Sequence, residues 1–165
     1  MCIRDRAKEM AEQLGEKTGL FEADFSEDAS DLSYENLKQY DAVYLNNSTS
    51  IERGLTDSKM REGFINYVKD GGGVVAIHAA TDGGWPEYVD MIGGNFDGHP
   101  WGHQGTYCLC NEDPRHPIVQ GIFDGRLSFP LNDELYQYKD FDRKKVRVLL
   151  SVSYTHLRAH ETSLH

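Results

Sequence analysis

One histidine of this 165-residue chain directly follows an apolar run, and a carboxylate comes soon after it. The run Gly-Val-Val-Ala-Ile precedes His78, and Asp82 lies four residues further on. Imidazole titrates near neutral pH, and a nearby carboxylate can fix its tautomer, so the pair suits general acid–base chemistry. Two other interpretations stay open. His78 could be a core histidine bonded to the backbone, and Asp82 could be the N-cap of the following helix.

Three more histidines follow in the same part of the chain: His99, His103 and His116. His99 and His103 are four residues apart, but an intervening proline and glycine favour a loop over a helix. We therefore predict no preformed metal site, although His78, His99 and a carboxylate could converge on one ion. The sequence does not indicate which cofactor, if any, the protein binds. His116 stands before a proline and is either a turn residue or a site residue.

Aromatic side chains lie near these histidines in the sequence, namely Trp85, Tyr88 and Trp101. Aromatic faces beside carboxylates and amides suit sugar rings, which stack through their C–H faces and form hydrogen bonds through their hydroxyls. Core packing explains any single one of these aromatics equally well.

The element that must position His78 is the run over residues 73–79. It is apolar and β-branched, bounded by glycines and too short for a core helix, which is typical of a strand buried on both faces and central in a parallel sheet. Ligands of open α/β sheets bind at the carboxyl ends of the strands. We therefore expect the functional site at that edge.

The order of helices and strands predicts a doubly wound α/β sheet. Thr56 is the expected N-cap of the helix before the central strand, and Gly71 is expected just beyond its last residue. The other predicted elements are helices over residues 7–17, 34–39 and 86–92, strands over residues 20–25, 41–46, 106–109 and 146–152, and a loop over residues 129–136.

The chain carries a formal net charge of −10 at pH 7, which argues against nucleic acid or an anionic membrane as a partner. No apolar run is long enough for a membrane span. Cys108 and Cys110 are two residues apart on a predicted strand, which suits a disulfide poorly, and no second thiolate pair completes a zinc site. We expect two buried free thiols.

Residues 1–6 and 153–165 fit no fold pattern and resemble translated sequencing adapter, a contaminant of chains predicted from environmental DNA. The expected native part is residues 7–152, a single domain of a bacterial metagenomic fragment that is truncated at both ends. Tyr154 and Leu157 are accordingly expected outside the core. Because the native N-terminus would be missing, cytoplasmic and periplasmic locations both stay open.

Five motifs follow one another along the chain: Gly-Val-Val-Ala-Ile-His78-Ala-Ala-Thr-Asp82, Phe96-Asp-Gly-His99-Pro100, Asp113-Pro-Arg-His116-Pro117, Asp133-Glu134-Leu-Tyr136 and Val148-Leu-Leu-Ser151. Together they resemble the ThuA-like family, named for trehalose utilisation, over nearly all of residues 7–152. The resemblance implies a flavodoxin-like α/β fold akin to class I glutamine amidotransferases. Those enzymes place a nucleophilic cysteine on a strained turn after a central strand. His78 stands at the matching position, so amide hydrolysis through a thiolate is not expected.

With this resemblance, the expected catalytic residues are His78, Asp82, His99 and Glu134, and the expected substrate-binding residues are Trp85, Trp101, His103, His116, Asp133 and Tyr136. We expect His78, Asp82, His99 and at least one of Asp133 and Glu134 to line a single cleft.

Two functions of different classes follow from this interpretation. The first is an enzyme of carbohydrate metabolism, a hydrolase or isomerase acting on a disaccharide such as trehalose or on its keto derivative, with His78 as acid–base and Asp82 orienting it. The second is a non-catalytic domain that binds a carbohydrate or a partner and keeps an amidotransferase-like pocket.

Overall fold

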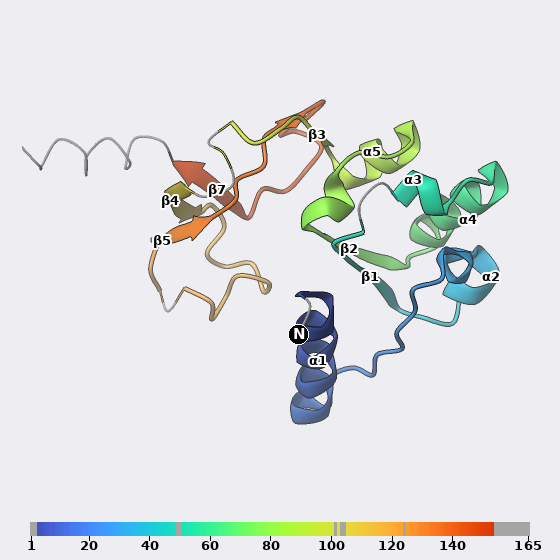
Figure 1. Cartoon of the computed structure of the whole chain (residues 1–165). Helices are drawn as coiled ribbons and strands as arrows, with labels where there is room; N and C mark the ends of the chain where they lie inside the picture. Colours follow the sequence, from blue (N-terminus) through green and yellow to red (C-terminus); the bar gives the residue numbers. More distant parts are fainter. Residues whose placement is uncertain (1–2, 49–50, 101, 103–104, 124, 154–165) are drawn as a thin grey trace, which may run out of the picture. The chain divides into compact units, whose positions relative to one another are not determined.

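The computed structural model describes residues 3–48, 51–100, 102, 105–123 and 125–153. The chain divides into two compact units, Met1–Asn95 and Phe96–His165. The first unit contains a parallel pair of strands and most of the helices, and the second contains an antiparallel sheet (Figure 1). Four residues named above lie outside the described residues: Trp101, His103, Tyr154 and Leu157.

The sheet of the first unit pairs β1 (Ala42–Asn46) with β2 (Gly73–Ile77) in parallel, with Ala42 opposite Gly73 and Asn46 opposite Ile77. Both strands lie where the sequence predicts them. Because the two strands are parallel and in register, their carboxyl ends lie side by side, and the residues that follow them are neighbours.

In the sequence, α4 (Ser58–Lys69) lies between β1 and β2, and it supplies the largest part of the core of the first unit. Its Phe64 is fully buried and Tyr67 is nearly so. The N-cap is Asp57, whose side chain accepts a hydrogen bond from the N–H of Lys59, so the expected cap at Thr56 is wrong by one residue. Gly71 has φ +104 after the C-cap Asp70, which confirms the expected left-handed residue that ends the helix.

The prediction that β2 is buried on both faces is wrong for the described residues. Val74 and Ala76 pack against the core, but Val75 and Ile77 are 46% and 40% exposed, and Tyr44 on β1 is 51% exposed. A continuous apolar run does not reveal by itself whether one or both faces are covered. Within the described residues β1 is the only neighbour of β2, so the doubly wound arrangement is not confirmed.

The remaining elements of the first unit are α1 (Ile3–Thr18), η1 (Ala29–Leu32), α2 (Tyr34–Leu37), α3 (Ile51–Gly54), η2 (His78–Thr81) and α5 (Pro86–Ile92). Helix α1 confirms the helix predicted over residues 7–17 and begins earlier, at Ile3, within the segment expected to fit no fold pattern. The strand predicted over residues 20–25 is wrong. This segment is irregular, and Leu20 is 83% exposed because no strand of the described chain pairs with it.

The second unit contains the antiparallel sheet β5-β4-β7 and a short pair of strands, β3 (Asn95–Phe96) with β6 (Tyr138–Lys139). The central strand β4 (Gly105–Asn111) lies between β5 (Ser128–Asp133) and β7 (Leu150–Ser153). The loop predicted over residues 129–136 is therefore partly strand. Its proline, Pro130, is tolerated in β5, because this strand pairs with one neighbour within the described residues. The strand predicted over residues 146–152 begins only at Leu150.

The core of the second unit contains Tyr107, Val119 and Phe123, and the ring of Phe123 lies 4.9 Å from that of Phe129. Cys108 and Cys110 on β4 form no disulfide with each other, and the prediction that both thiols are buried is wrong, because both are only partly buried. None of the helices in the described part of the chain is long and apolar enough to cross a membrane.

Candidate functional site

Both parallel strands of the first unit end in a residue with left-handed backbone. Asn47 follows β1 with φ 53, and His78 follows β2 with φ 54. Residues other than glycine rarely adopt this backbone conformation, although asparagine and histidine do so more often than most. The N–H of Asn47 donates to the carbonyl of Ile77 at 3.3 Å, which extends the strand pairing up to the two turns.

The side chains of these two residues contact each other. The Nδ1 atom of His78 lies 2.8 Å from Oδ1 of Asn47, and the same oxygen accepts a hydrogen bond from the N–H of Ala79 at 3.3 Å. The hydroxyl of Thr81 donates to the carbonyl of His78 at 2.8 Å and supports the turn. His78 is exposed, so the interpretation of a buried core histidine does not describe it.

Asn47 is a residue that the sequence analysis missed. Its signal was available, since it follows a predicted strand that is parallel to the strand before His78, and asparagine favours left-handed turns. The prediction that Asp82 orients the imidazole stays a prediction. Asp82 is not the N-cap of the next helix, because that position belongs to Trp85, and its Oδ1 atom is buried.

Trp85 and Tyr88 are core residues of the first unit. Trp85 is 7% exposed, and its ring lies 5.1 Å from that of Tyr88 and 6.3 Å from that of Phe64. The guanidinium of Arg61 lies over the Trp85 ring at 5.4 Å. These contacts favour core packing over a sugar-stacking role for Trp85.

Burial and the carboxylate of Glu52 both affect the pKa of Tyr88 in this core. Burial, followed by the negative charge of Glu52, raises the pKa of Tyr88 to about 12. The Tyr88 hydroxyl donates to the carbonyl of Ala80 at 2.7 Å, so it ties α5 to the turn that carries His78.

In the second unit, the structure brings together three predicted site residues from two motifs. The Nδ1 atom of His99 lies 3.5 Å from Oε1 of Glu134, and both side chains are mostly buried. The His99 ring lies 4.8 Å from that of Tyr136 in an edge arrangement, and Phe96 contacts both rings, at 4.9 and 4.6 Å. We call His99, Glu134, Tyr136 and Phe96 the His99 cluster.

Backbone pairing holds the two segments of this cluster together. The N–H of Asp97 donates to the carbonyl of Gln137 at 2.8 Å, and the N–H of Gln137 donates to the carbonyl of Gly98 at 3.0 Å. The hydroxyl of Tyr107 on β4 donates to the carbonyl of Glu134 at 3.0 Å. Burial, with the charges of Asp133 and Glu134, raises the pKa of Tyr107.

Asp133 and His116 have local roles in the structure. The Oδ1 atom of Asp133 accepts from the N–H of Glu134 at 2.8 Å. The Nδ1 atom of His116 accepts from the N–H of Ile118 at 3.3 Å, and its carbonyl accepts from Val119 and Gln120, which favours the turn interpretation. Binding of a ligand by either residue stays a prediction.

The single cleft stays a prediction as well. His78 and Asp82 belong to the first unit, whereas His99, Asp133 and Glu134 belong to the second. Within the described residues, no group of three or more histidine, cysteine, aspartate or glutamate side chains is arranged to hold a metal ion.

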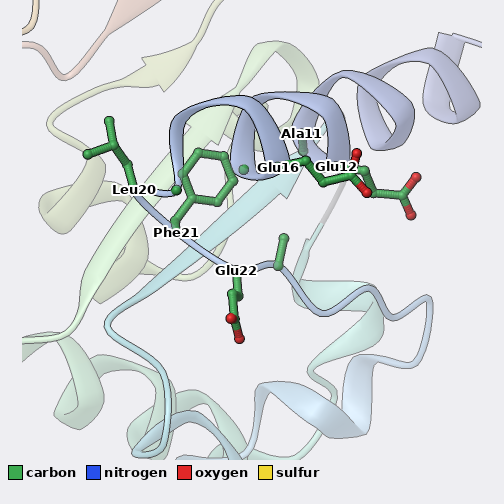
Figure 2. A pocket seen from close by; sticks show the side chains of 9 residues that line it. Ala11, Glu12, Glu16, Leu20, Phe21 and Glu22 are labelled. Atoms are coloured by element: carbon green, nitrogen blue, oxygen red, sulfur yellow. The ribbon is translucent and has the colours of Figure 1, made fainter.

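A surface hollow lies beside α1 and the segment after it (Figure 2). Its lining contains none of the predicted site residues: Ala11, Glu12, Gly15, Glu16, Gly19, Leu20, Phe21, Glu22 and Ala23. Its carboxylates come from neighbouring turns of one exposed helix and the segment that follows it, so they define no specific chemistry.

Comparison with known proteins identifies relatives of the whole chain. The family model of ThuA, described as trehalose utilisation, matches residues 3–164. The crystal structure of a ThuA-like protein from Bacteroides uniformis is 30% identical with a TM-score of 0.75, over 90% of this chain and 60% of that one. The crystal structure of a ThuA-like protein from Parabacteroides merdae has a similar fold, with a TM-score of 0.62. It is 24% identical, and the match covers 88% of this chain and 62% of that one.

The chain therefore spans about three fifths of the length of these two proteins. A search of curated proteins found no match. Since the family model covers nearly every residue, from 3 to 164, the chain belongs to the ThuA family.

Proposed function

We propose that this protein acts in carbohydrate metabolism related to trehalose utilisation, as an enzyme that moves a proton on a disaccharide or its keto derivative. Its membership in the ThuA family supports the substrate class. The observation that carries the chemistry is His78, an exposed imidazole at the end of β2 whose Nδ1 atom is held by Asn47 at 2.8 Å. This contact supports an acid–base role for the other ring nitrogen, Nε2.

A keto sugar offers a suitable reaction for one imidazole. The keto group acidifies the C–H bond of the neighbouring carbon. In the proposed step Nε2 of His78 accepts that proton, and the electron pair of the C–H bond moves toward the carbonyl to give an enediolate. The neighbouring carbon carries a hydroxyl, as in a sugar. The imidazolium returns the proton to the former carbonyl carbon, the C–O bond of that neighbouring hydroxyl becomes the new carbonyl, and the proton of this hydroxyl passes to the former carbonyl oxygen. This isomerisation consumes no oxidant, and a positioned acid–base group typically contributes about 10²–10⁴-fold to such a rate.

The turn after β2 supports acid–base chemistry over amide hydrolysis. The φ of 54 at His78 is compatible with the strained turn that the proposed resemblance to glutamine amidotransferases implies at this position. An imidazole at this position accepts protons but provides no thiolate nucleophile. We therefore do not propose glutamine hydrolysis.

We propose that the His99 cluster is a carbohydrate-binding site of the second unit, which binds the hydroxyls and ring faces of a sugar. The Glu134 carboxylate can accept hydroxyl hydrogen bonds, and the rings of Tyr136 and Phe96 can stack against C–H faces. Close packing between these rings, at 4.6 Å, gives the cluster a fixed shape that needs little ordering when a ligand binds.

The test is turnover of a panel of disaccharides and their keto derivatives, trehalose included. The expected result is turnover of at least one keto sugar and a loss of about 100-fold or more in kcat for His78→Gln. Glu62→Gln, on the exposed face of α4, is the surface control and should retain wild-type kinetics. A longer ThuA homologue should be assayed in parallel, because this chain spans about three fifths of its relatives.

A different outcome would favour the second function. Calorimetric titration that shows sugar binding without turnover, with the same affinity in His78→Gln, would contradict the enzyme proposal. The protein would then be a carbohydrate-binding domain.

A further inference from the structure

We infer that Asn47 is a positioning residue that fixes which nitrogen of the His78 imidazole carries the proton. The inference rests on the proposed acid–base role of His78. It gives Asn47, the residue that follows β1, an indirect role in the reaction. Two independent features of the structure support it, a shared hydrogen-bond acceptor and a matched backbone conformation.

The shared acceptor determines the tautomer. A backbone N–H can only donate, so the Asn47 side-chain atom that faces the N–H of Ala79 at 3.3 Å is the amide oxygen. The Nδ1 atom of His78 lies 2.8 Å from that same oxygen. An amide oxygen has no proton to donate, so Nδ1 must be the donor. The neutral imidazole therefore carries its proton on Nδ1 and its lone pair on Nε2.

The backbone keeps the two side chains in this arrangement. Asn46 lies opposite Ile77 in the parallel register, and Asn47 and His78 follow with φ 53 and 54. Asparagine adopts the left-handed region at little cost, since its short polar side chain can form local hydrogen bonds. Asn47 thus terminates β1 and also presents an oxygen to the neighbouring strand end.

The Asn47 amide carries no charge, and this has a consequence for the proposed proton transfer by His78. The amide oxygen accepts the Nδ1 proton whether His78 is neutral or protonated, so the hydrogen bond persists through a cycle in which Nε2 gains and loses a proton. The imidazole ring therefore keeps one orientation in both halves of the proposed proton transfer.

The direct test is the tautomer of His78 in the full chain, measured by long-range ¹H–¹⁵N correlation spectra at about pH 8, above the ordinary range of imidazole titration. The His78 signals are assigned by their loss in His78→Gln. The wild-type chain should show the Nδ1–H form. Asn47→Gly keeps a residue suited to positive φ but removes the oxygen, and it should convert His78 largely to the Nε2–H form.

Two further variants complete the test. Asn47→Asp retains an acceptor oxygen and should retain the Nδ1–H form. Asp140→Gly removes a polar side chain at another left-handed residue, φ 56, and should leave the His78 spectrum unchanged. An Nε2–H form in the wild-type chain, or an Nδ1–H form that survives in Asn47→Gly, would overturn the inference.

Kinetics separate this inference from the proposed function. If a keto sugar is turned over, Asn47→Gly should lower kcat by about 10–100-fold and leave KM within about 3-fold, because ring orientation affects the reacting geometry more than binding. Unchanged kcat in Asn47→Gly would contradict the positioning role. Absence of turnover in the wild type would overturn the proposed function alone, and the tautomer spectra would still decide the role of Asn47.

Discussion

The hydroxyl of Ser151 donates to Oε1 of Glu112 at 2.6 Å and so joins β7 to the end of β4. Arg143 donates to the other carboxylate oxygen at 2.7 Å, and the N–H of Glu112 donates to the carbonyl of Leu149 at 2.9 Å. The bond from Ser151, followed by the charge and hydrogen bond of Arg143, lowers the pKa of Glu112. One carboxylate thus holds the C-terminal part of the second unit on its central strand.

We predict that this carboxylate makes the second unit sensitive to acid. Because the folded pKa of Glu112 lies below its ordinary value of 4.5, its contribution is complete above that value and is lost as the pH falls through the lowered folded pKa. Glu112→Gln should therefore lower the urea midpoint at neutral pH, and the difference from wild type should shrink on acidification. Glu62→Gln is the control. A pH-independent difference would contradict the prediction.

Phe64 is the residue whose truncation should destabilise the first unit most. Its side chain is fully buried, and its ring lies 6.3 Å from that of Trp85 and 6.2 Å from that of Tyr88. Phe64→Ala should lower the free energy of unfolding by about 3–5 kcal/mol, since it removes apolar contacts and leaves a cavity. Chemical denaturation followed by tryptophan fluorescence measures this change, because Trp85 lies beside the cavity.

Val75→Ala is the matched control for Phe64→Ala. Val75 is an apolar strand residue of the same unit, but it is 46% exposed. Its truncation should cost less than about 1 kcal/mol. Equal losses for the two variants would contradict the assignment of the core to one face of the sheet.

The cap of α4 gives a test that separates the sequence prediction from the structure. Asp57 accepts from the N–H of Lys59 at 2.8 Å, whereas Thr56 was the cap expected from the sequence. Asp57→Ala should cost about 1 kcal/mol, and Asp57→Asn should recover most of it. Thr56→Ala should change the free energy of unfolding by less than about 0.5 kcal/mol. The opposite ranking of the two alanine variants would restore Thr56 as the cap.

The sequence predicts those elements whose signals are local. The strand before Asn47, the strand before His78 and the left-handed glycine at Gly71 follow from apolar runs and helix-ending residues, and all three are confirmed. The strand over residues 20–25 fails because its partial alternation had no partner strand. The error at β5 has the same origin, since whether Pro130 fits a strand depends on which neighbours pair with it.

The candidate site residues are likewise predictable only where their signals are local in the sequence. His99 and Glu134 are predicted site residues from two separate family motifs, and the structure places their side chains 3.5 Å apart. Asn47 lay outside those motifs, and its contact with His78 depends on the parallel register of β1 and β2. Side-chain contacts between strand ends depend on register, and a single sequence specifies register weakly.

Tyr88 joins the core of the first unit to the turn that carries His78. Its side chain is 1% exposed, and its hydroxyl donates to the carbonyl of Ala80 at 2.7 Å. Removal of this hydroxyl in Tyr88→Phe should cost about 1 kcal/mol at neutral pH, because the carbonyl of Ala80 loses its donor.

The same residue should limit stability at alkaline pH. Burial and the charge of Glu52 raise the folded pKa of Tyr88 from 10.0 to about 12, so between these values the unfolded chain loses a proton that the folded chain keeps. Stability from this group is complete below pH 10.0 and is lost as the pH rises toward 12. Tyr88→Phe has no proton to lose, so the free energy of unfolding should fall less steeply above pH 10.0 than in the wild type. Urea denaturation between neutral pH and pH 12 measures both slopes, and parallel curves would show that Tyr88 ionises as readily in the folded chain as in the unfolded one.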